Sequence, residues 1–375
     1  MSRLPRDLHP VAWWLWALGL AAGSSMTTNP LTLLLLMTVA AVVVAARRSD
    51  HAWSGSFRLY VGLAIVIVVM RVVFRLVFGG VDGGRVLLDL PEIPLPDWVA
   101  GVRLLGPVTQ QSLLAGLYDG LRLAALVICV GAANSLANPK RLLKSVPPAL
   151  YEIGTALVVA VTIFPQLADS VRRVRSAQNL RGGPSGRVGR LRRFLVPVLE
   201  DALERSLALA AGMDSRGYGR APGLDSSARR LTGTLLVVGL LGICVGTYAV
   251  LDLTAPRVLA VPMLALGSVA AVAGLWSAGR RVDRTRYRPE RWQAAELLVA
   301  ASGVVVAVAM WEVGRTQLFV AHPGVDLTPT LSVLALVGCL VGLAPAVLAP
   351  PPTSTVPKGA PALEEASERE AVAAR

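Results

Sequence analysis

Cysteine is scarce in this sequence of 375 residues, which contains Cys129, Cys244 and Cys339 and no others. The three lie far apart in apolar stretches, and no two stand at the C-x-x-C spacing of redox and metal-binding motifs. This pattern indicates neither a disulfide framework nor a zinc site. We therefore expect no metal and no cofactor.

Lysine is equally rare, and its rarity excludes one class of function. The sequence has Lys140, Lys144 and Lys358, and none of them is preceded by glycine. A nucleotide-binding loop needs a glycine-rich turn that leads directly into Lys-Ser or Lys-Thr. The chain therefore cannot itself be an ATP-driven motor of that type.

The motifs of common hydrolytic enzymes are also missing. The sequence has three histidines, His9, His51 and His322. They are scattered, and the chain has no H-E-x-x-H, no G-x-S-x-G and no cluster of acidic residues. Each histidine is interpreted as a loop or interface residue, because none has a partner at ligand spacing. We expect that the chain is not an enzyme.

Positive charge is abundant, with a formal net charge of +13 and 37 basic residues, nearly all of them arginine. Such a charge is compatible with nucleic-acid binding, but aromatic residues make up only 5% of the chain and lie mostly in apolar runs. They are poorly placed to stack on bases beside the arginines. The basic residues are better explained as membrane-topology signals, and no nucleic-acid partner is predicted.

Long apolar runs dominate the rest of the sequence, which is 54% hydrophobic. Each run is close to the ~20 residues that a membrane-spanning helix needs. The eight predicted spans are 11–27, 30–46, 59–78, 111–133, 232–252, 258–279, 293–313 and 330–349. The predicted fold class is therefore all-α, a polytopic helical membrane protein with about eight spans and, between the fourth and fifth, two long cytoplasmic helices.

The basic residues orient these spans. Arg47-Arg48, the group Lys140–Lys144 and the arginine run within 280–291 should all face the cytoplasm, and an even number of spans satisfies all three. We predict a multi-pass protein of the cell membrane with both termini cytoplasmic and the loop 79–110 outside. Four segments follow: N-terminal spans 1–138, a cytoplasmic module 139–230, C-terminal spans 231–349 and a disordered cytoplasmic tail 350–375.

The module 139–230 contains two amphipathic helical patterns that are not predicted to span. Residues 153–168 are apolar, but a crossing there would place the basic residues on either side of it on opposite faces of the membrane. The second pattern, Phe194–Met213, carries four charged residues, which are costly at the centre of a bilayer. Both are expected in or beneath the cytoplasmic interface, and each has apolar residues at alternating spacings of four and three.

Both helical patterns end in the same way. A small residue stands four positions before an arginine, and glycine follows the arginine. The residues concerned are Ala177, Leu180, Arg181 and Gly182 in the first ending and Gly212, Met213, Ser215, Arg216 and Gly217 in the second. One such ending is common, because arginine complements a helix dipole and glycine adopts the left-handed conformation after the cap. Two copies about 35 residues apart, after matching apolar patterns, favour a functional reading in which each guanidinium binds a carboxylate of another protein.

These runs, RRVRSAQNLRGG and LVPVLEDALERSLALAAGMDSRGYG, resemble the signature of the T component of energy-coupling factor (ECF) transporters, the CbiQ/EcfT-like proteins. The resemblance covers roughly residues 140–220, and TRYRPERW at 285–292 is similar to the segment before a late span of that family. It implies that Leu180-Arg181-Gly182 and Ser215-Arg216-Gly217 are two X-Arg-X motifs, each docking on one of two ABC-type ATPase subunits. Ala177, Gly212 and Met213 would then pack at the ends of these coupling helices.

The resemblance further implies a third partner, an integral membrane subunit that binds the substrate, a vitamin or a transition-metal ion. The chain would transmit ATP-driven movement to that subunit. Two other functions stay open from the residues alone: a permease that works without other subunits, and a polytopic membrane enzyme.

Two smaller patterns within the spans give structural predictions. Arg71 and Arg75, one turn apart in the third span, are expected to pair with Asp119 of the fourth, as an alternative to reaching the lipid headgroups. Three Gly-x-x-x-Gly patterns, which begin at Gly19, Gly242 and Gly338, would allow close approach of helices.

Overall fold

The computed structural model describes residues 6–49, 55–78, 84–91, 105–145, 151–181, 187–217, 226–252, 257–279, 292–325 and 328–352. This part of the chain is predominantly helical, as expected. The helices are α1 Pro10–Ser25, α2 Pro30–Arg47, α3 Phe57–Val77, α4 Gln110–Leu136, α5 Pro139–Lys144, α6 Tyr151–Arg181, α7 Arg187–Ser215, α8 Ser226–Leu251, α9 Arg257–Gly279, α10 Ala294–Thr316, α11 Leu318–Ala321, α12 Val333–Val341 and α13 Ala344–Leu348.

Seven helices among the described residues are long and apolar enough to cross a membrane. Six of them, α2, α3, α4, α8, α9 and α10, correspond to predicted spans. The seventh is the part Ile153–Ala177 of α6, which the charge pattern placed at the cytoplasmic interface. The chain is thus an all-α, polytopic membrane protein, and the side on which α6 lies remains a prediction from the charge distribution.

The first and last predicted spans differ from the others. Helix α1 is apolar but has only 16 residues. The predicted span 330–349 is wrong as a single helix, because it breaks into α12, with nine residues, and α13, with five. Pro345 occupies the first turn of α13, where its missing backbone N–H costs no hydrogen bond within the helix.

A two-stranded antiparallel sheet was not predicted. It joins β1, Val86–Asp89, to β2, Pro107–Thr109, within the predicted outer loop. Thr109 ends this hairpin and also caps α4, because its side chain accepts a hydrogen bond from the backbone N–H of Ser112. The sheet therefore sets the start of the fourth predicted span.

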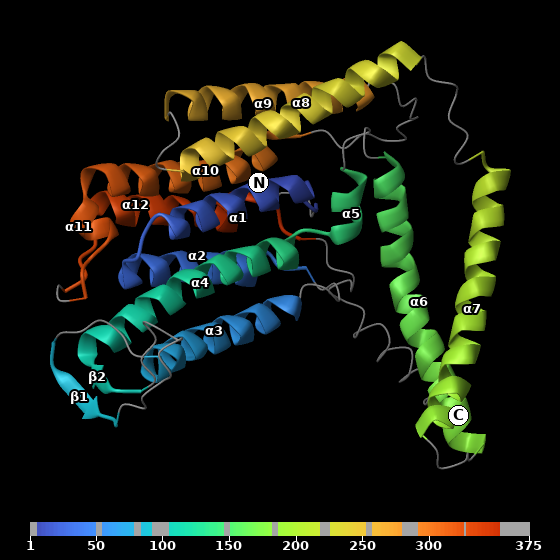
Figure 1. Ribbon diagram of the computed structural model, residues 1–375, viewed down its shortest axis with the longest axis horizontal. Helices are drawn as coiled ribbons and strands as arrows, with labels where there is room; N and C mark the ends of the chain where they lie inside the picture. Colours follow the sequence, from blue (N-terminus) through green and yellow to red (C-terminus); the bar gives the residue numbers. More distant parts are fainter. Residues whose placement is uncertain are drawn as a thin grey trace, which may run out of the picture. The chain divides into compact units, whose positions relative to one another are not determined.

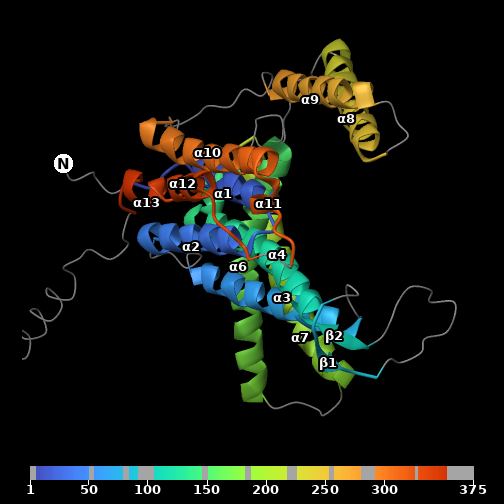
Figure 2. The ribbon, with the colours of Figure 1, turned by 90° about the vertical axis from the view of Figure 1, so that its left-hand side faces the viewer.

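The described chain divides into two compact units. The first comprises Met1–Leu142 and Pro289–Arg375, and the second comprises Leu143–Arg288. Within the first unit α1 lies between α10 and α4, and α4 in turn packs against α2 and α3 (Figures 1 and 2). The predicted C-terminal group 231–349 is therefore divided, since α10 to α13 pack with the N-terminal helices and α8 and α9 belong to the second unit.

Glycine allows α1 and α10 to pack closely, as the Gly-x-x-x-Gly pattern predicts. A Cβ atom on Gly303 of α10 would lie 2.5 Å from the Cα atom of Trp16, and Gly19 faces the backbone of Gly303. The Trp16 side chain is fully buried, and its indole N–H donates to the carbonyl of Gly342, 3.0 Å away. Thus the first and last helices of this unit share one core.

Helices α3 and α4 also pack through glycine, and they carry the predicted charge pair. A Cβ atom on Gly120 would lie 3.1 Å from the Cα atom of Val68. Arg75 Nη2 lies 3.3 Å from Asp119 Oδ2, which confirms the pairing for Arg75. The side chain of Arg71 passes Gly120 and forms no ion pair within the described part of the chain.

In the second unit, α8 and α9 form a tightly packed pair of helices. A Cβ atom on Gly242 would lie 2.8 Å from the Cα atom of Gly267, and one on Gly246 would lie 2.7 Å from the backbone N atom of Leu264. The side chains of Thr232 and Ser277 share a hydrogen bond of 3.3 Å. The second Gly-x-x-x-Gly pattern therefore also serves packing within the chain.

Candidate coupling site

Helices α6 and α7 are the longest in the described chain, with 31 and 29 residues, and they carry both predicted arginine endings. Five residues, 182–186, separate them in the sequence, and five residues span at most about 20 Å. The start of α7 must therefore lie near the end of α6. Figure 1 shows the two helices running in opposite directions and crossing.

One cluster of polar side chains joins the two helices. The carboxylate of Asp201 on α7 accepts a hydrogen bond from Arg205 Nε one turn away, at 3.0 Å. Arg173 Nη2 of α6 lies 3.5 Å from the same carboxylate. Ser170 is buried, with 2% of its surface exposed, although most of its neighbours on α6 are exposed.

The electrostatics of the cluster keep Asp201 charged. The hydrogen bond from Ser170, followed by the one from Arg205, holds the pKa of Asp201 below its usual range, and the positive charges of Arg205 and Arg173 act in the same direction. Each of these interactions favours the carboxylate over the carboxylic acid. The Asp201–Arg205 spacing of four residues is a familiar helix pairing that the sequence could have revealed, whereas nothing in the sequence singles out Ser170.

The apolar patterns of α6 and α7 are not buried against each other along their length. Leu157 and Phe164 of α6 are 46% and 75% exposed, and Leu199 of α7 is 62% exposed. Other positions are partly covered, among them Leu167 and Val171 of α6 and Val198 and Ala202 of α7. A large apolar surface therefore remains outside the contact between the two helices.

The end of α7 has the geometry predicted for an exposed arginine. The backbone N–H of Arg216 donates to the carbonyl of Met213 at 3.1 Å, and that of Gly217 donates to the carbonyl of Asp214 at 2.9 Å. Gly217 adopts a φ of 75°, the left-handed conformation in which glycine carries no steric penalty. These bonds close the last turn and stop the helix directly after Ser215.

Nothing in the described chain covers this end. Ser215, Arg216 and Gly217 are exposed, and Arg216 forms no ion pair among the described residues. A Cβ atom on Gly212, the small residue four positions before the arginine, would meet nothing within 4 Å. Met213 is partly buried. The surface formed by Gly212, Ser215, Arg216 and Gly217 is thus open to another molecule.

The first ending is described less completely. Helix α6 is described as far as Arg181, and Ala177 is exposed on its last turns. Gly182 lies outside the described residues, as do the side chains of Leu180 and Arg181. The two endings stand at opposite ends of the pair, because α6 and α7 run in opposite directions (Figure 1).

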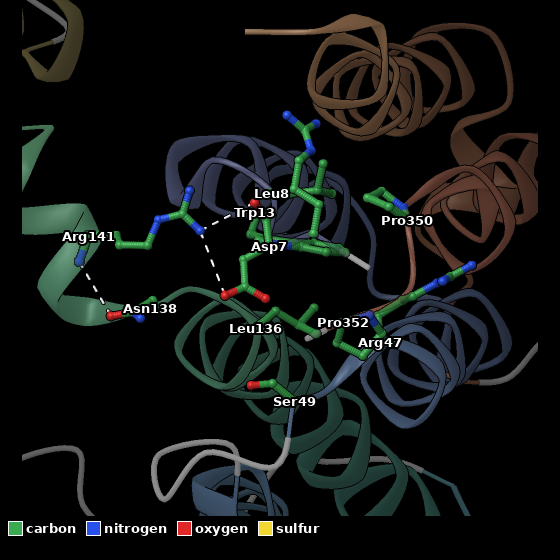
Figure 3. Close-up of a pocket in the computed structure, with 11 residues that line it drawn as sticks. Asp7, Leu8, Trp13, Arg47, Ser49, Leu136, Asn138, Arg141, Pro350 and Pro352 are labelled. Atoms are coloured by element: carbon green, nitrogen blue, oxygen red, sulfur yellow. Dashed lines mark hydrogen bonds and ion pairs between the residues drawn. The ribbon is translucent and has the colours of Figure 1, made fainter. Parts of the chain in front are cut away.

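A small cavity in the first unit is lined by charged residues, but their bonds are internal (Figure 3). Arg141 donates to the carbonyl of Asp7 at 3.2 Å, and Arg47 donates to the carbonyl of Ala346 at 2.6 Å. The cavity measures about 30 Å³, which is room for one or two water molecules. These contacts tie the segment before α1 to α5 and the end of α2 to α13, and they support the fold.

Comparison with known proteins gives consistent matches. A family model described as cobalt transport protein, CbiQ, matches residues 1–225. Three curated relatives carry the description energy-coupling factor transporter transmembrane protein EcfT. The relative from Leuconostoc gelidum subsp. gasicomitatum is 25% identical over 191 residues, which are 44% of this chain and 71% of that protein.

The other two relatives match shorter stretches. The relative from Lactococcus lactis subsp. cremoris is 24% identical over 171 residues, 41% of this chain and 58% of that protein. The relative from Staphylococcus aureus is 28% identical over 127 residues, 30% of this chain and 47% of that protein. The family match ends at residue 225, so α8 and the helices after it lie beyond the matched region.

Proposed function

Because the chain belongs to the CbiQ family of cobalt transport proteins, we propose that it is the transmembrane coupling component of an ECF-type importer. In this role it links two ABC-type ATPase subunits to a separate membrane subunit that binds a vitamin or a transition-metal ion. The names of its EcfT relatives and its apolar helices support this assignment. Both termini and the pair α6–α7 face the cytoplasm, as the distribution of basic residues favours.

The exposed end of α7 is the observation that carries the proposal. Arg216 extends from a helix end that the left-handed Gly217 closes, and no described residue neutralises its charge. An exposed guanidinium on a stiff helix can make two parallel hydrogen bonds to a carboxylate of a partner. Ser215 and Gly217, which flank it, leave room for that partner. Arg181, flanked in the sequence by Leu180 and Gly182, is the corresponding arginine in the last turn of α6.

The proposed mechanism is mechanical. One ATPase subunit binds the Arg181 end and the other binds the Arg216 end. ATP binding draws the two ATPase subunits together, and each carries its arginine end with it. The exposed apolar surface of α6 and α7 transmits the displacement to the substrate-binding subunit, which reorients and releases its substrate. The chain contributes force transmission, and the partner contributes substrate recognition.

The test uses the full chain co-expressed with ABC-type ATPase subunits that carry Walker motifs. We expect the ATPases to co-purify with the wild-type chain. Arg181→Ala and Arg216→Ala together should abolish co-purification while the chain stays folded, because loss of one partner of a buried interfacial charge pair costs about 2–5 kcal/mol. Unchanged co-purification of the double variant would refute the coupling role, and substrate transport by the chain alone would favour the permease.

A further inference from the structure

We propose that the end of the α6–α7 pair beside the linker 182–186 binds the anionic phospholipid headgroups of the cytoplasmic leaflet, with Arg175 and Arg192 as its main contacts. Neither arginine belongs to an X-Arg-X motif, and the proposal goes beyond the proposed function because its ligand is the membrane itself. The two share only the cytoplasmic placement of α6 and α7, which the distribution of basic residues favours.

Positive charge is concentrated at this end of the pair. Residues 172–199 contain eight arginines and no acidic residue. The rest of the segment 151–217 contains six acidic residues and two arginines, so its net charge is −4. Because the linker has only five residues, the end of α6 lies within about 20 Å of the start of α7. The arginines of both helices therefore gather in one region.

Several arginines of this region have no partner of their own. Arg173 Nη2 lies 3.5 Å from Asp201 Oδ2, where the two helices meet, and the Arg173 side chain is still 60% exposed. Arg175, Arg192 and Arg193 are exposed and form no hydrogen bond or ion pair within the described part of the chain. Their charge is available to an anionic ligand.

Arg175 lies in line with an outward-facing apolar stripe of α6. It follows Phe164 by eleven residues and Leu157 by eighteen, and both apolar side chains are exposed. At 3.6 residues per turn these separations are about three and five turns, so the three side chains leave the helix on one face. The stripe therefore ends in an exposed guanidinium on the linker side.

Helix α7 repeats this arrangement in the opposite direction. Arg192 precedes Val196, Leu199 and Leu203 by four, seven and eleven residues, which are about one, two and three turns. All three apolar side chains are exposed. Arg192 thus caps the linker end of the apolar stripe of α7, as Arg175 does on α6.

An apolar stripe that ends in arginine is suited to a membrane surface. The apolar side chains enter the boundary of the acyl chains, and the guanidinium stays at the level of the phosphates. The part Ile153–Ala177 of α6 is apolar enough to enter a membrane. The cytoplasmic leaflet carries anionic lipids that attract polybasic segments. An acidic protein surface or a nucleic acid would complement the charge and leave both stripes in water, so the observations favour lipid.

The test measures amide hydrogen exchange of the full chain in two kinds of nanodisc, one of phosphatidylcholine and one of phosphatidylcholine mixed with phosphatidylglycerol. We expect the protection of residues 172–199 to rise at least about fivefold in the anionic nanodiscs, the factor that one arginine near such a surface contributes. High salt should remove the gain, because exposed charges are screened. Equal protection in the two nanodiscs would overturn the proposal.

Two double variants examine the named arginines. Arg175→Gln with Arg192→Gln should lose most of the gain. Arg175→Lys with Arg192→Lys should keep it, because attraction to headgroups follows charge and does not need the fork of a guanidinium. A gain that survives the glutamine variant would overturn the role of these two residues. A gain that the lysine variant loses would contradict a surface held by charge.

Arg85→Gln with Arg315→Gln is the matched control, because it removes the same charge from two exposed arginines of the first unit. It should leave the gain unchanged. An equal loss in the control would assign the effect to the net charge of the chain and overturn a local surface.

Co-purification with the ATPase subunits in detergent free of anionic lipid separates a lipid ligand from a protein ligand. Arg175→Gln with Arg192→Gln should retain the ATPases as the wild-type chain does. Their loss would assign this surface to a protein and overturn the lipid proposal. If the wild-type chain itself retains no ATPase, that result counts against the proposed function, and the nanodisc measurement still decides the lipid proposal.

Discussion

Arg6 and Glu296 stand 290 residues apart and form an ion pair, with 2.7 Å between Arg6 Nη2 and Glu296 Oε1. Only 2% of the Glu296 side chain is exposed, and its other oxygen accepts a hydrogen bond from the backbone N–H of Gln293. The backbone N–H of Arg6 also donates to the carbonyl of Pro351. The segment before α1, the start of α10 and the segment after α13 therefore meet at one buried carboxylate.

Replacing this carboxylate should destabilise the first unit. Glu296→Gln keeps the size of the side chain and removes its charge, so Arg6 loses its partner. Breaking a buried ion pair costs about 3–5 kcal/mol, and we expect the lower end of that range because 36% of the Arg6 side chain is exposed. Thermal unfolding in detergent measures the loss.

Glu312→Gln is the control on the same helix. Glu312 is partly exposed and forms no ion pair within the described residues. Its substitution should change the free energy of unfolding by less than about 0.5 kcal/mol. Equal destabilisation by the two variants would show that the ion pair with Arg6 is not what Glu296 contributes.

The ion pair Arg75–Asp119 should contribute less to the free energy of unfolding than the ion pair Arg6–Glu296. Both side chains are partly exposed, at 33% and 40%, so neither is fully desolvated by the protein. Asp119→Asn should lower stability by about 1 kcal/mol, a value typical of polar contacts between helices in membranes. A double-mutant cycle with Arg75→Gln isolates the interaction of the two groups. A coupling energy of zero would mean that Arg75 is satisfied by lipid headgroups and not by Asp119.

The sequence was sufficient for most of the helices and for the glycine faces that allow close packing, because both depend on local patterns. Apolar runs of the right length identified α2, α3, α4, α8, α9 and α10. The spacing of Gly19 and Gly23 indicated a flat helix face, although nothing in the sequence identified Gly303 as the surface it meets. Pairing across the fold depends on which faces meet, and periodicity alone does not specify that.

The site was predicted in part for the same reason. The ending Ser215-Arg216-Gly217 is a local pattern, and the left-handed Gly217 confirms the turn that the pattern predicts. The ion pair between Arg173 and Asp201 joins two helices and has no signature in either of them. The interruption of the last span could not have been predicted from Pro345 alone, since α9 continues through Pro262 in a similar apolar run.

Packing of α1 against α10 should be intolerant of any side chain at Gly303. The Cβ atom of Gly303→Ala would lie 2.5 Å from the Cα atom of Trp16, so the helix backbones must separate. Forced overpacking of this kind costs about 1–3 kcal/mol, which thermal unfolding in detergent can resolve. Gly314→Ala, on the same helix with nothing within 4 Å, should be neutral or slightly stabilising. Similar losses for both would show that the loss at Gly303 does not come from the close contact with Trp16.

The two glycines at the end of α7 should respond in opposite directions to the same substitution. Gly217→Ala forces alanine into the left-handed conformation at φ 75°, which costs about 1 kcal/mol and frays the end of α7. Gly212→Ala places alanine in a helix where nothing lies within 4 Å, and should stabilise that helix by about 1 kcal/mol. Hydrogen exchange at the last turn of α7 measures both effects in the chain alone.

Co-purification of the ATPase subunit with these two glycine variants should distinguish an effect on the stability of α7 from an effect on docking. If a partner packs directly on Gly212, Gly212→Ala weakens co-purification although it strengthens the helix, because the added methyl group occupies space that the partner needs. Gly217→Ala should also weaken binding, through a frayed Arg216 end. An ATPase that binds Gly212→Ala as tightly as the wild-type chain would place the docking contact beyond Gly212, on Arg216 and its immediate neighbours.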